Sequence, residues 1–433
     1  MNQEARIKYF EKKKNETPYS YKDIYYQGIK QKLPVYKIDL EWLIYNRWNG
    51  RIASFVKTYE KEYGVELDGA EPKCIEIIEN FLWESNKTAN EATFDSISEQ
   101  GQNEYGIITK DGVIIDGNRR AMILKQVAKK KKETPIYFLG VVLDEKLADN
   151  YKEIMRLETT YQMGEDAKVD YNPIEKYLKC KDMIEAGFKA EEIGKAMGEH
   201  NTKVIEEYLE IMNLMDEYLS ELGYTGIYTR LDKTEDLFIN LNKVYNRWKT
   251  SPGKVTWKFK QNDLDAFKLV SFDHIRYVYN SPKGIQAKEI REFLTRNSEE
   301  SFFAHENIWK DFSNRHAKKV DSITNNEKTV DELRAENPTR DLSSLLKSKD
   351  LTWATQVDSA IKENFGLTKE ALENLQDKSE PLKLLQSALG KLQAIDTTSG
   401  SFLNDENVFK IVDDIRKTAD EYKKIITTHQ KHK

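Results

Sequence analysis

Short apolar runs alternate with polar turns in the first third of the chain, a pattern typical of a small mixed sheet. A helical pattern follows the third run, where Ala121, Leu124 and Ala128 recur at three- and four-residue steps. We therefore expect a small α/β domain over residues 33–150, preceded by a peripheral arm over residues 1–32. The predicted strands cover residues 33–40, 107–109, 113–115 and 135–143, and residues 84–93 are expected to form a loop.

From about residue 151 the pattern becomes helical and stays so. Asn172 followed by Pro173 is typical of an N-cap with proline at the first helical position. Two helical stretches, residues 190–198 and 203–214, are separated by only a few residues, which predicts a helix-turn-helix or an ordinary helical hairpin. The other expected parts are a domain at 151–225 that holds this motif, an aromatic-rich helical domain with a packed core at 226–320, a linker at 321–345 and a C-terminal helical bundle at 346–433.

The length, charge and cysteine content of the chain limit the classes of protein to which it can belong. The 433 residues are enough for two or three domains, and the net charge of −5 argues against a basic surface over the whole molecule. Cys74 and Cys180 are too few for a disulfide scaffold or a cysteine-based metal site. The sequence offers no apolar stretch typical of a signal peptide or a membrane span. We therefore expect a cytoplasmic protein without a membrane partner.

The most distinctive stretch joins a predicted strand to a predicted helix. The apolar run at residues 113–115 ends at Asp116-Gly117, and the helix that follows begins with Arg119 and Arg120. Helix N-termini present free N–H groups and favour negative charge, and arginine donates strong hydrogen bonds to phosphate oxygens. The pattern therefore predicts an anion site, although an ordinary strand-turn-helix with solvated arginines fits the same residues.

Five segments in a fixed order resemble the ParB/sulfiredoxin superfamily, and beyond the motif they resemble a ParB-type partition protein. The segments are Ser96–Gln102, Asp116–Arg120, Glu158–Gln162, Asn172–Glu175 and the predicted helix-turn-helix. The likeness covers about residues 33–220. Together with the helical pattern of the remaining residues, it implies an α+β fold: a small ParB/sulfiredoxin-like α/β domain, a helix-turn-helix domain and a largely α-helical C-terminal half.

The resemblance also implies roles for individual residues. A nucleoside triphosphate, CTP or ATP with Mg²⁺, would be bound by Gly117, Asn118, Arg119 and Arg120, with Gly101 and Gln102 near the base or sugar and Glu158 and Thr159 closing over the phosphates or the metal ion. Asp116 and Glu158 would be the catalytic carboxylates, and Glu158 the metal ligand. The family's E-N-I-Q-R segment here reads Glu-Thr-Thr-Tyr-Gln, so only its glutamate is kept.

DNA contacts are expected at the start of the second helix of the helix-turn-helix. The candidates are His200, Asn201, Thr202 and Lys203, whereas Glu206, Glu207 and Glu210 further along would repel phosphates. Sulfiredoxin chemistry is excluded, because it needs a cysteine where this chain has Asn118.

The leading hypothesis is a nucleotide-binding, DNA-associated switch that forms a homodimer or binds a protein partner through its C-terminal helices. Residues 382–392 carry an apolar face suited to such a contact. One alternative is a nuclease or small-molecule kinase on the same fold that uses Asp116, Glu104 and Glu158. Another is a protein-binding adaptor with a vestigial nucleotide site.

Overall fold

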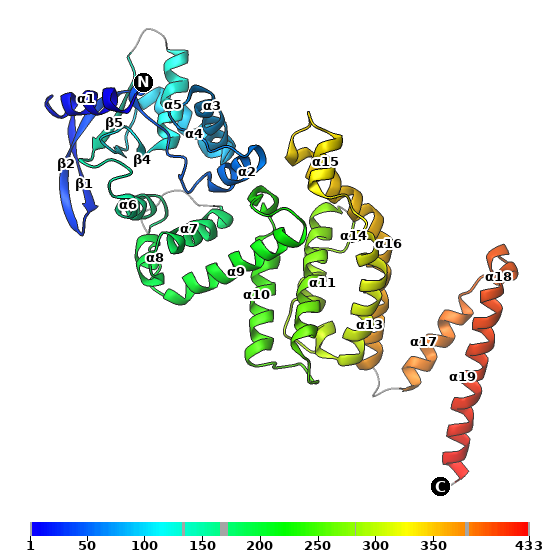
Figure 1. The fold of residues 1–433 in the computed structure, drawn as a ribbon. Helices are drawn as coiled ribbons and strands as arrows, with labels where there is room; N and C mark the ends of the chain where they lie inside the picture. Colours follow the sequence, from blue (N-terminus) through cyan, green and yellow to red (C-terminus); the bar gives the residue numbers. More distant parts are fainter. Residues whose placement is uncertain (1, 132–134, 165–171, 282, 377–380, 432–433) are drawn as a thin grey trace. The chain divides into compact units, whose positions relative to one another are not determined.

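The computed structural model describes residues 2–131, 135–164, 172–281, 283–376 and 381–431. The chain divides into two compact units, Met1–Phe365 and Gly366–Lys433 (Figure 1). It is a mixed α+β protein with a small sheet near the N-terminus and a helical C-terminal half, which confirms the broad fold class. None of the described helices combines the length and the hydrophobicity that a bilayer crossing needs.

The sheet has the order β1-β2-β5-β3-β4, and only the β3–β5 pair is parallel. Gln27 and Gly28 join β1 to β2 as a two-residue hairpin turn, and both have positive φ, at 53° and 81°. The strands are β1 (Ser20–Tyr26), β2 (Ile29–Asp39), β3 (Gly106–Ile108), β4 (Ile114–Asp116) and β5 (Tyr137–Val142).

Residues 2–32, expected to form a peripheral arm, pack with this sheet domain instead. Phe10 is fully buried in the core, and the side chain of Arg6 donates to the carbonyl of Asp111. Ile24 and Tyr26 of β1 are buried while Tyr25 between them is exposed, as expected for a strand with one face on the core. The edge strand β1 therefore completes the sheet domain.

Helices cover the sheet and contribute most of the core. They are α1 (Gln3–Lys14), η1 (Leu40–Trp42), α2 (Ala53–Tyr63), α3 (Pro72–Glu84), α4 (Lys87–Gln100) and α5 (Asn118–Lys130). Residues 87–93, expected to lie in a loop, belong to α4. Asn86 caps this helix, since its side chain accepts from the N–H of Ala89. The buried amide of Asn90 donates to the carbonyls of Leu82 and Trp83 at the end of α3. Side-chain capping therefore decides the structure of this polar segment.

Four helices follow the sheet: α6 (Tyr151–Met163), α7 (Pro173–Glu185), α8 (Ala190–Met197) and α9 (Thr202–Glu221). The side chain of Asn172 accepts from the N–H of Ile174, so the predicted cap of α7 is confirmed. A Cβ added at Gly194 would lie 2.9 Å from the carbonyl oxygen of Glu199, so the turn after α8 approaches this helix very closely. Glycine at this position permits the sharp turn into α9.

The rest of the first unit is helical, and its aromatic side chains form a packed core as predicted. Trp248, Phe267, Phe303 and Trp309 are all buried, and each has ring contacts with at least two of the others. The predicted linker at 321–345 contains two short helices. The elements are η2 (Tyr228–Leu231), α10 (Glu235–Thr250), α11 (Gln261–Asn280), α12 (Ala287–Glu289), η3 (Ile290–Leu294), η4 (Phe302–Ala304), α13 (Glu306–His316), η5 (Ala317–Asp321), α14 (Ser322–Thr324), α15 (Val330–Glu336) and α16 (Leu342–Gln376), which extends into the second unit.

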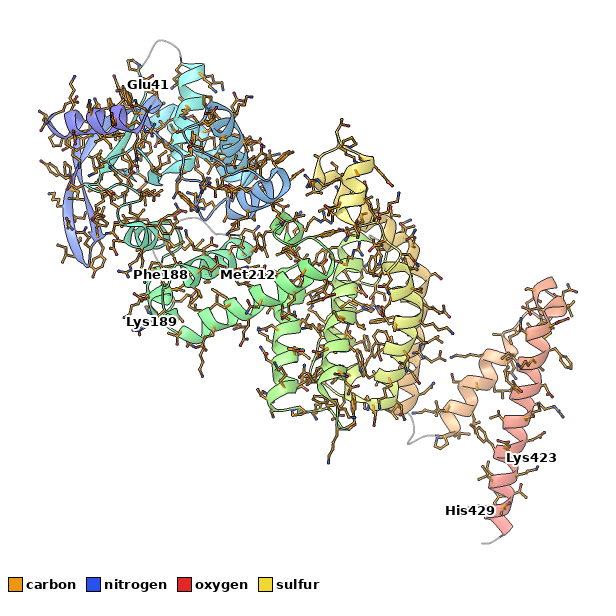
Figure 2. All side chains as sticks on the ribbon, in the orientation of Figure 1. Glu41, Phe188, Lys189, Met212, Lys423 and His429 are labelled. Carbon is orange, nitrogen blue, oxygen red and sulfur yellow. The ribbon has the colours of Figure 1, made fainter. Side chains whose placement is uncertain are left out.

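The second unit also contains α17 (Pro381–Gln393), α18 (Gly400–Asn404) and α19 (Glu406–Lys431). Figure 2 shows the side chains along these helices, with Lys423 and His429 of α19 labelled.

Candidate functional site

Strand β4 leads into the N-terminus of α5 through a turn that only glycine can form. Gly117 is the N-cap residue and has a φ of 108°. A Cβ at this position would lie 2.9 Å from the ring of Phe138 in the core. The turn therefore packs tightly on the sheet, and the first N–H groups of α5, which have no acceptor within the helix, point away from its body.

Two cations share one carboxylate beside this turn. Nη2 of Arg120 lies 2.6 Å from Oδ2 of Asp116, and Nζ of Lys22 lies 3.9 Å from the same oxygen. Burial lowers the pKa of Lys22 most, and the positive charge of Arg120 lowers it further, against the opposing effect of Asp116. The Nε atom of Arg120 is buried and has no hydrogen-bond partner among the described residues. Among these three side chains positive charge exceeds negative charge, and the carboxylate of Glu104 adds a further negative charge that acts on Lys22.

Asn118 and Arg119 have different roles in the structure. The Asn118 side chain is buried, accepts from the N–H of Asn46 at 3.0 Å and donates to the carbonyl of Ile114 at 3.0 Å. Nε of Arg119 donates to Oδ1 of Asn90 at 2.7 Å. Asn118 thus fixes the turn from inside, while both arginines come from the first turn of α5.

The side-chain amide of Gln102 forms two hydrogen bonds with the backbone of β5, as the backbone of a neighbouring strand would. Its Oε1 accepts from the N–H of Leu139 at 2.8 Å, and its Nε2 donates to the carbonyl of the same residue at 2.7 Å. Gly101 ends α4 with a φ of 78°. Gln102 therefore lies next to β5, and its described contacts hold that strand in place.

Glu158 and Thr159 lie inside the protein, on α6. The Glu158 carboxylate contacts Nζ of Lys179 at 2.8 Å and accepts from the N–H of Gly50 at 3.2 Å, and both ends of the ion pair are buried. Burial raises the pKa of Glu158 despite the opposing effect of Lys179. The Thr159 hydroxyl donates to the carbonyl of Met155 at 2.8 Å. To bind Glu158 as predicted, a metal ion would have to displace the ammonium group of Lys179.

Three residues that sequence reasoning did not select connect this region to its surroundings. Lys22 lies in the segment predicted as an arm, and no local pattern links it to Asp116. Lys179 faces inward from α7, and a lysine in a helix gives no signal of burial. Glu175 accepts hydrogen bonds from both the N–H and the hydroxyl of Ser54 near the start of α2, and burial raises the pKa of Glu175 to about 7. Its signals in the sequence were its place in the segment Asn172–Glu175 and an acidic side chain in the first turn after Asn172-Pro173.

The four candidate DNA contacts lie together and exposed at the turn between α8 and α9. The side chain of Asn201 caps α9 by accepting from the N–H of Lys203 at 3.0 Å. Glu210, expected to repel DNA, instead accepts from the amides of Asn242 and Asn246 on α10. One of the three glutamates of α9 is therefore used for packing between helices. The exposed candidates are His200, Asn201, Thr202 and Lys203.

A possible metal-binding cluster lies elsewhere, in the helical part of the first unit. Nε2 of His316 is 2.9 Å from Oδ2 of Asp273 and 4.0 Å from Oδ1 of Asp321. Within the described part of the chain these residues form the only group of three His, Cys, Asp or Glu with metal-ligand spacing. Asp116, Glu104 and Glu158 thus form no such group in that part.

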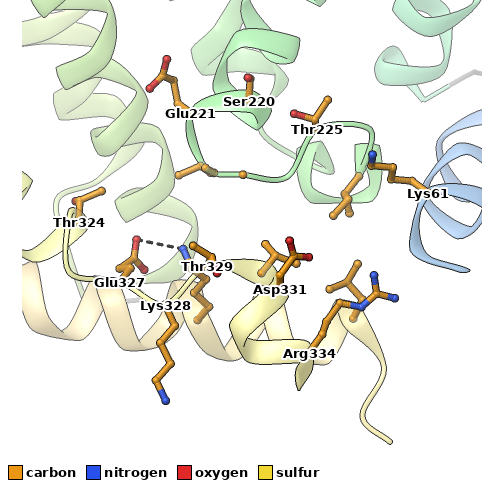
Figure 3. A pocket seen from close by; sticks show the side chains of 16 residues that line it. Lys61, Ser220, Glu221, Thr225, Thr324, Glu327, Lys328, Thr329, Asp331 and Arg334 are labelled. Atoms are coloured by element: carbon orange, nitrogen blue, oxygen red, sulfur yellow. Dashed lines mark ion pairs between the residues drawn. The ribbon is translucent and has the colours of Figure 1, made fainter. Parts of the chain in front are cut away.

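A cavity of about 580 Å³ is lined by residues of both charges. Figure 3 shows the side chains that line it. Lys61 of α2 and Arg334 of α15 contribute positive charge, and Asp331 and Glu327 contribute negative charge. Glu327 is already paired with Lys349 at 3.2 Å. This lining selects neither anions nor cations, in contrast to the group beside α5.

No protein-family model matches the chain, and no curated protein matches it significantly. The resemblance to the ParB/sulfiredoxin superfamily stays a prediction.

Proposed function

We propose that this protein is a nucleotide-binding, DNA-associated switch of the ParB type, which binds CTP or ATP with Mg²⁺ at the N-terminus of α5. The observation that carries the proposal is the pair of cations, Arg120 and Lys22, that share the single carboxylate of Asp116 beside a glycine turn and a helix N-terminus. A helix N-terminus with two cations beside it favours the negative charge of a triphosphate.

Arg120 has donors to spare for a phosphate. A guanidinium group carries five N–H donors, and the described hydrogen bond of Arg120 uses one of them, on Asp116. The adjacent Arg119 extends from the same helical turn. Charge-assisted hydrogen bonds from arginine to phosphate are frequently bidentate, so this end of α5 is chemically suited to polyphosphate.

A continuous set of contacts could convey binding at the turn to the helices that follow. The amide of Gln162 on α6 donates to the carbonyl of Ile115 on β4 at 3.0 Å. One turn earlier on α6, Glu158 pairs with Lys179 on α7. The α8–α9 turn with the candidate DNA contacts lies beyond α7. In the proposed switch, a triphosphate on α5 changes the position of α6 and, through it, the presentation of a helix-turn-helix formed by α8 and α9.

The proposal covers binding and assigns no hydrolysis. Both predicted catalytic carboxylates have cationic partners, since Asp116 contacts Arg120 and Glu158 contacts Lys179.

Calorimetric titration with each of the four ribonucleoside triphosphates, in the presence of Mg²⁺, tests the proposal. We expect CTP or ATP to bind the wild-type chain. We expect Arg120→Ala to weaken binding about 10- to 100-fold, as estimated for the loss of one hydrogen bond to a charged group.

The matched control is Arg296→Ala, because Arg296 is an exposed arginine with only a long ion pair to Glu300. It should bind as the wild type does. The proposal is wrong if no triphosphate binds the wild-type chain, or if Arg120→Ala binds with unchanged affinity. The DNA-associated part is wrong if the triphosphate leaves the affinity for duplex DNA unchanged.

A further inference from the structure

A histidine and two aspartates lie together where α11 packs against α13 and the turn that follows it (Figure 1). Nε2 of His316 is 2.9 Å from Oδ2 of Asp273 and 4.0 Å from Oδ1 of Asp321, and the three ligand atoms all lie within 4.8 Å of one another. The ligands of a tetrahedral ion with bonds of about 2.1 Å are about 3.4 Å apart. The two distances from His316 bracket that value, so only small side-chain shifts are needed for these three groups to bind one metal ion.

A π-helical turn brings the second aspartate to the histidine. Helix α13 ends at His316, and η5, which begins at the next residue and ends at Asp321, is a π-helix. In an α-helix, residues five positions apart point about 140° away from each other around the axis. The i→i+5 hydrogen bonding of a π-helix turns such residues closer to one face, and these rare turns are frequent at functional sites. The backbone thus departs from the α-helix where the departure places a carboxylate beside His316.

The two carboxylates share this imidazole as their cationic partner. In the described parts of the chain, no lysine or arginine forms an ion pair with either of them, although the Asp273 side chain is only 18% exposed and that of Asp321 49%. Burial raises the pKa of Asp321 and the charge of Asp273 raises it further, against the opposing effect of His316. Buried carboxylates are usually paired with cations or bound to metal ions. Here two negative charges face at most one positive charge, so a cation would stabilise the group.

The ligand types favour a transition metal over Mg²⁺ or Ca²⁺. Imidazole nitrogen suits zinc and its neighbours, whereas Mg²⁺ and Ca²⁺ prefer oxygen ligands alone, and Zn²⁺ binds both imidazole and carboxylate. Two carboxylates and a neutral imidazole would exactly offset the charge of a divalent ion, which suits the buried position of His316. The half-exposed Asp321 gives an ion access from solvent. Three protein ligands leave one coordination position for water.

We propose that Asp273, His316 and Asp321 bind one Zn²⁺ ion, which ties α11 to the end of α13 and to η5 and keeps one position open to water. Because the ion binds the folded chain, it stabilises this helical region. The proposal goes beyond the nucleotide site and its Mg²⁺, since it rests on residues of α11, α13 and η5 alone.

Calorimetric titration of the full chain, stripped of metal with a chelator and free of nucleotide, with ZnCl₂ tests this inference. We expect one Zn²⁺ to bind each wild-type chain. Asp321→Asn should weaken that binding at least about 100-fold, because even a lost partner of a metal ligand costs about 10- to 100-fold. Asp273→Asn removes the ligand on the other helix and should cause a similar loss. In thermal denaturation, Zn²⁺ should raise the Tm of the wild type and leave the Tm of both variants unchanged.

Asp311→Asn is the control, because Asp311 is an exposed aspartate of α13 outside the cluster. It should bind Zn²⁺ as the wild type does. A wild-type chain that binds no Zn²⁺ would overturn the proposal. Equal binding by the wild type and Asp321→Asn, or an equal loss in Asp311→Asn, would overturn it as well and would identify an adventitious ion only. Triphosphate titration of Asp321→Asn keeps the two proposals apart, because its affinity for nucleotide should equal that of the wild type.

Discussion

Arg276 on α11 and Arg120 at the start of α5 both donate to carboxylates, but in different surroundings. Arg276 is fully buried, and its Nε, Nη1 and Nη2 atoms donate to Asp350 and Glu327 at 2.8 to 2.9 Å. Its guanidinium group also lies 4.3 Å from the ring centroid of Trp353. Arg120 is partly exposed, donates to Asp116, and has a buried Nε without a partner in the described structure.

The difference separates an arginine that holds a fold together from one suited to a ligand. The Arg276 contacts link α11 to α16 and to the segment before α15, and all three of its nitrogen atoms are satisfied. Near Arg120, the positive charge of Lys22 competes for the same carboxylate. A phosphate would add no useful contact at Arg276. Beside Arg120, its negative charge would balance the positive charges of Arg120 and Lys22.

The largest expected effect is on the buried arginine. Arg276→Met should lower the free energy of unfolding by about 3–5 kcal/mol, because Asp350 and Glu327 would lose a buried partner. Arg120→Met should change it by less than about 1 kcal/mol, as is usual for partly exposed ion pairs. Urea denaturation of both variants measures the difference. Equal destabilisation by the two substitutions would contradict the claim that Arg276, and not Arg120, holds the fold together.

The pH dependence of the free energy of unfolding tests a second buried group of the helical region, His274 on α11. Burial, together with the charge of His316, lowers the pKa of His274 to about 4. The unfolded chain, with a pKa near 6.5, therefore binds more protons than the folded chain between these values. The contribution of His274 to stability is complete above about pH 6.5 and falls by about 3 kcal/mol as the pH drops through 4.

Comparing the pH dependence of stability of the wild type with that of His274→Leu separates the contribution of His274 from that of Glu175. The pKa of Glu175 is raised to about 7, so its own contribution has the opposite sign. Denaturation at a series of pH values should show a smaller loss on acidification for His274→Leu than for the wild type. Parallel curves for the two proteins would contradict the prediction.

The smallest expected effect is on the affinity of the proposed nucleotide site for a triphosphate. Asp116→Asn removes the carboxylate that Arg120 and Lys22 share, so affinity for a triphosphate without Mg²⁺ should rise about 3- to 10-fold, the effect of roughly 1 kcal/mol. Calorimetric titration with and without Mg²⁺ is the measurement. A loss of affinity that appears only with Mg²⁺ would instead identify Asp116 as a metal ligand.

Local pattern in the sequence predicted several elements well. The β-branched run before Asp116 forms β4, and the cap at Asn172 starts α7 at Pro173. Strand β1 was missed because tyrosine-rich polar segments carry a weak strand signal until a neighbouring strand pairs with them. The first turns of helix α4, residues 87–93, were predicted as a loop because they are polar, and their stability comes from the side chains of Asn86 and Asn90.

The sequence by itself determined where a strand, a glycine turn and two arginines follow one another, and it determined the apolar face of residues 382–392. Only the tertiary structure decided that Asn118 faces inward, that Lys22 joins Arg120 at Asp116, and that Lys179 closes over Glu158. Periodicity and turn chemistry act over a few residues, so they can be recognised along the chain. The charge around a carboxylate depends on groups far away in sequence, and folding alone brings those groups together.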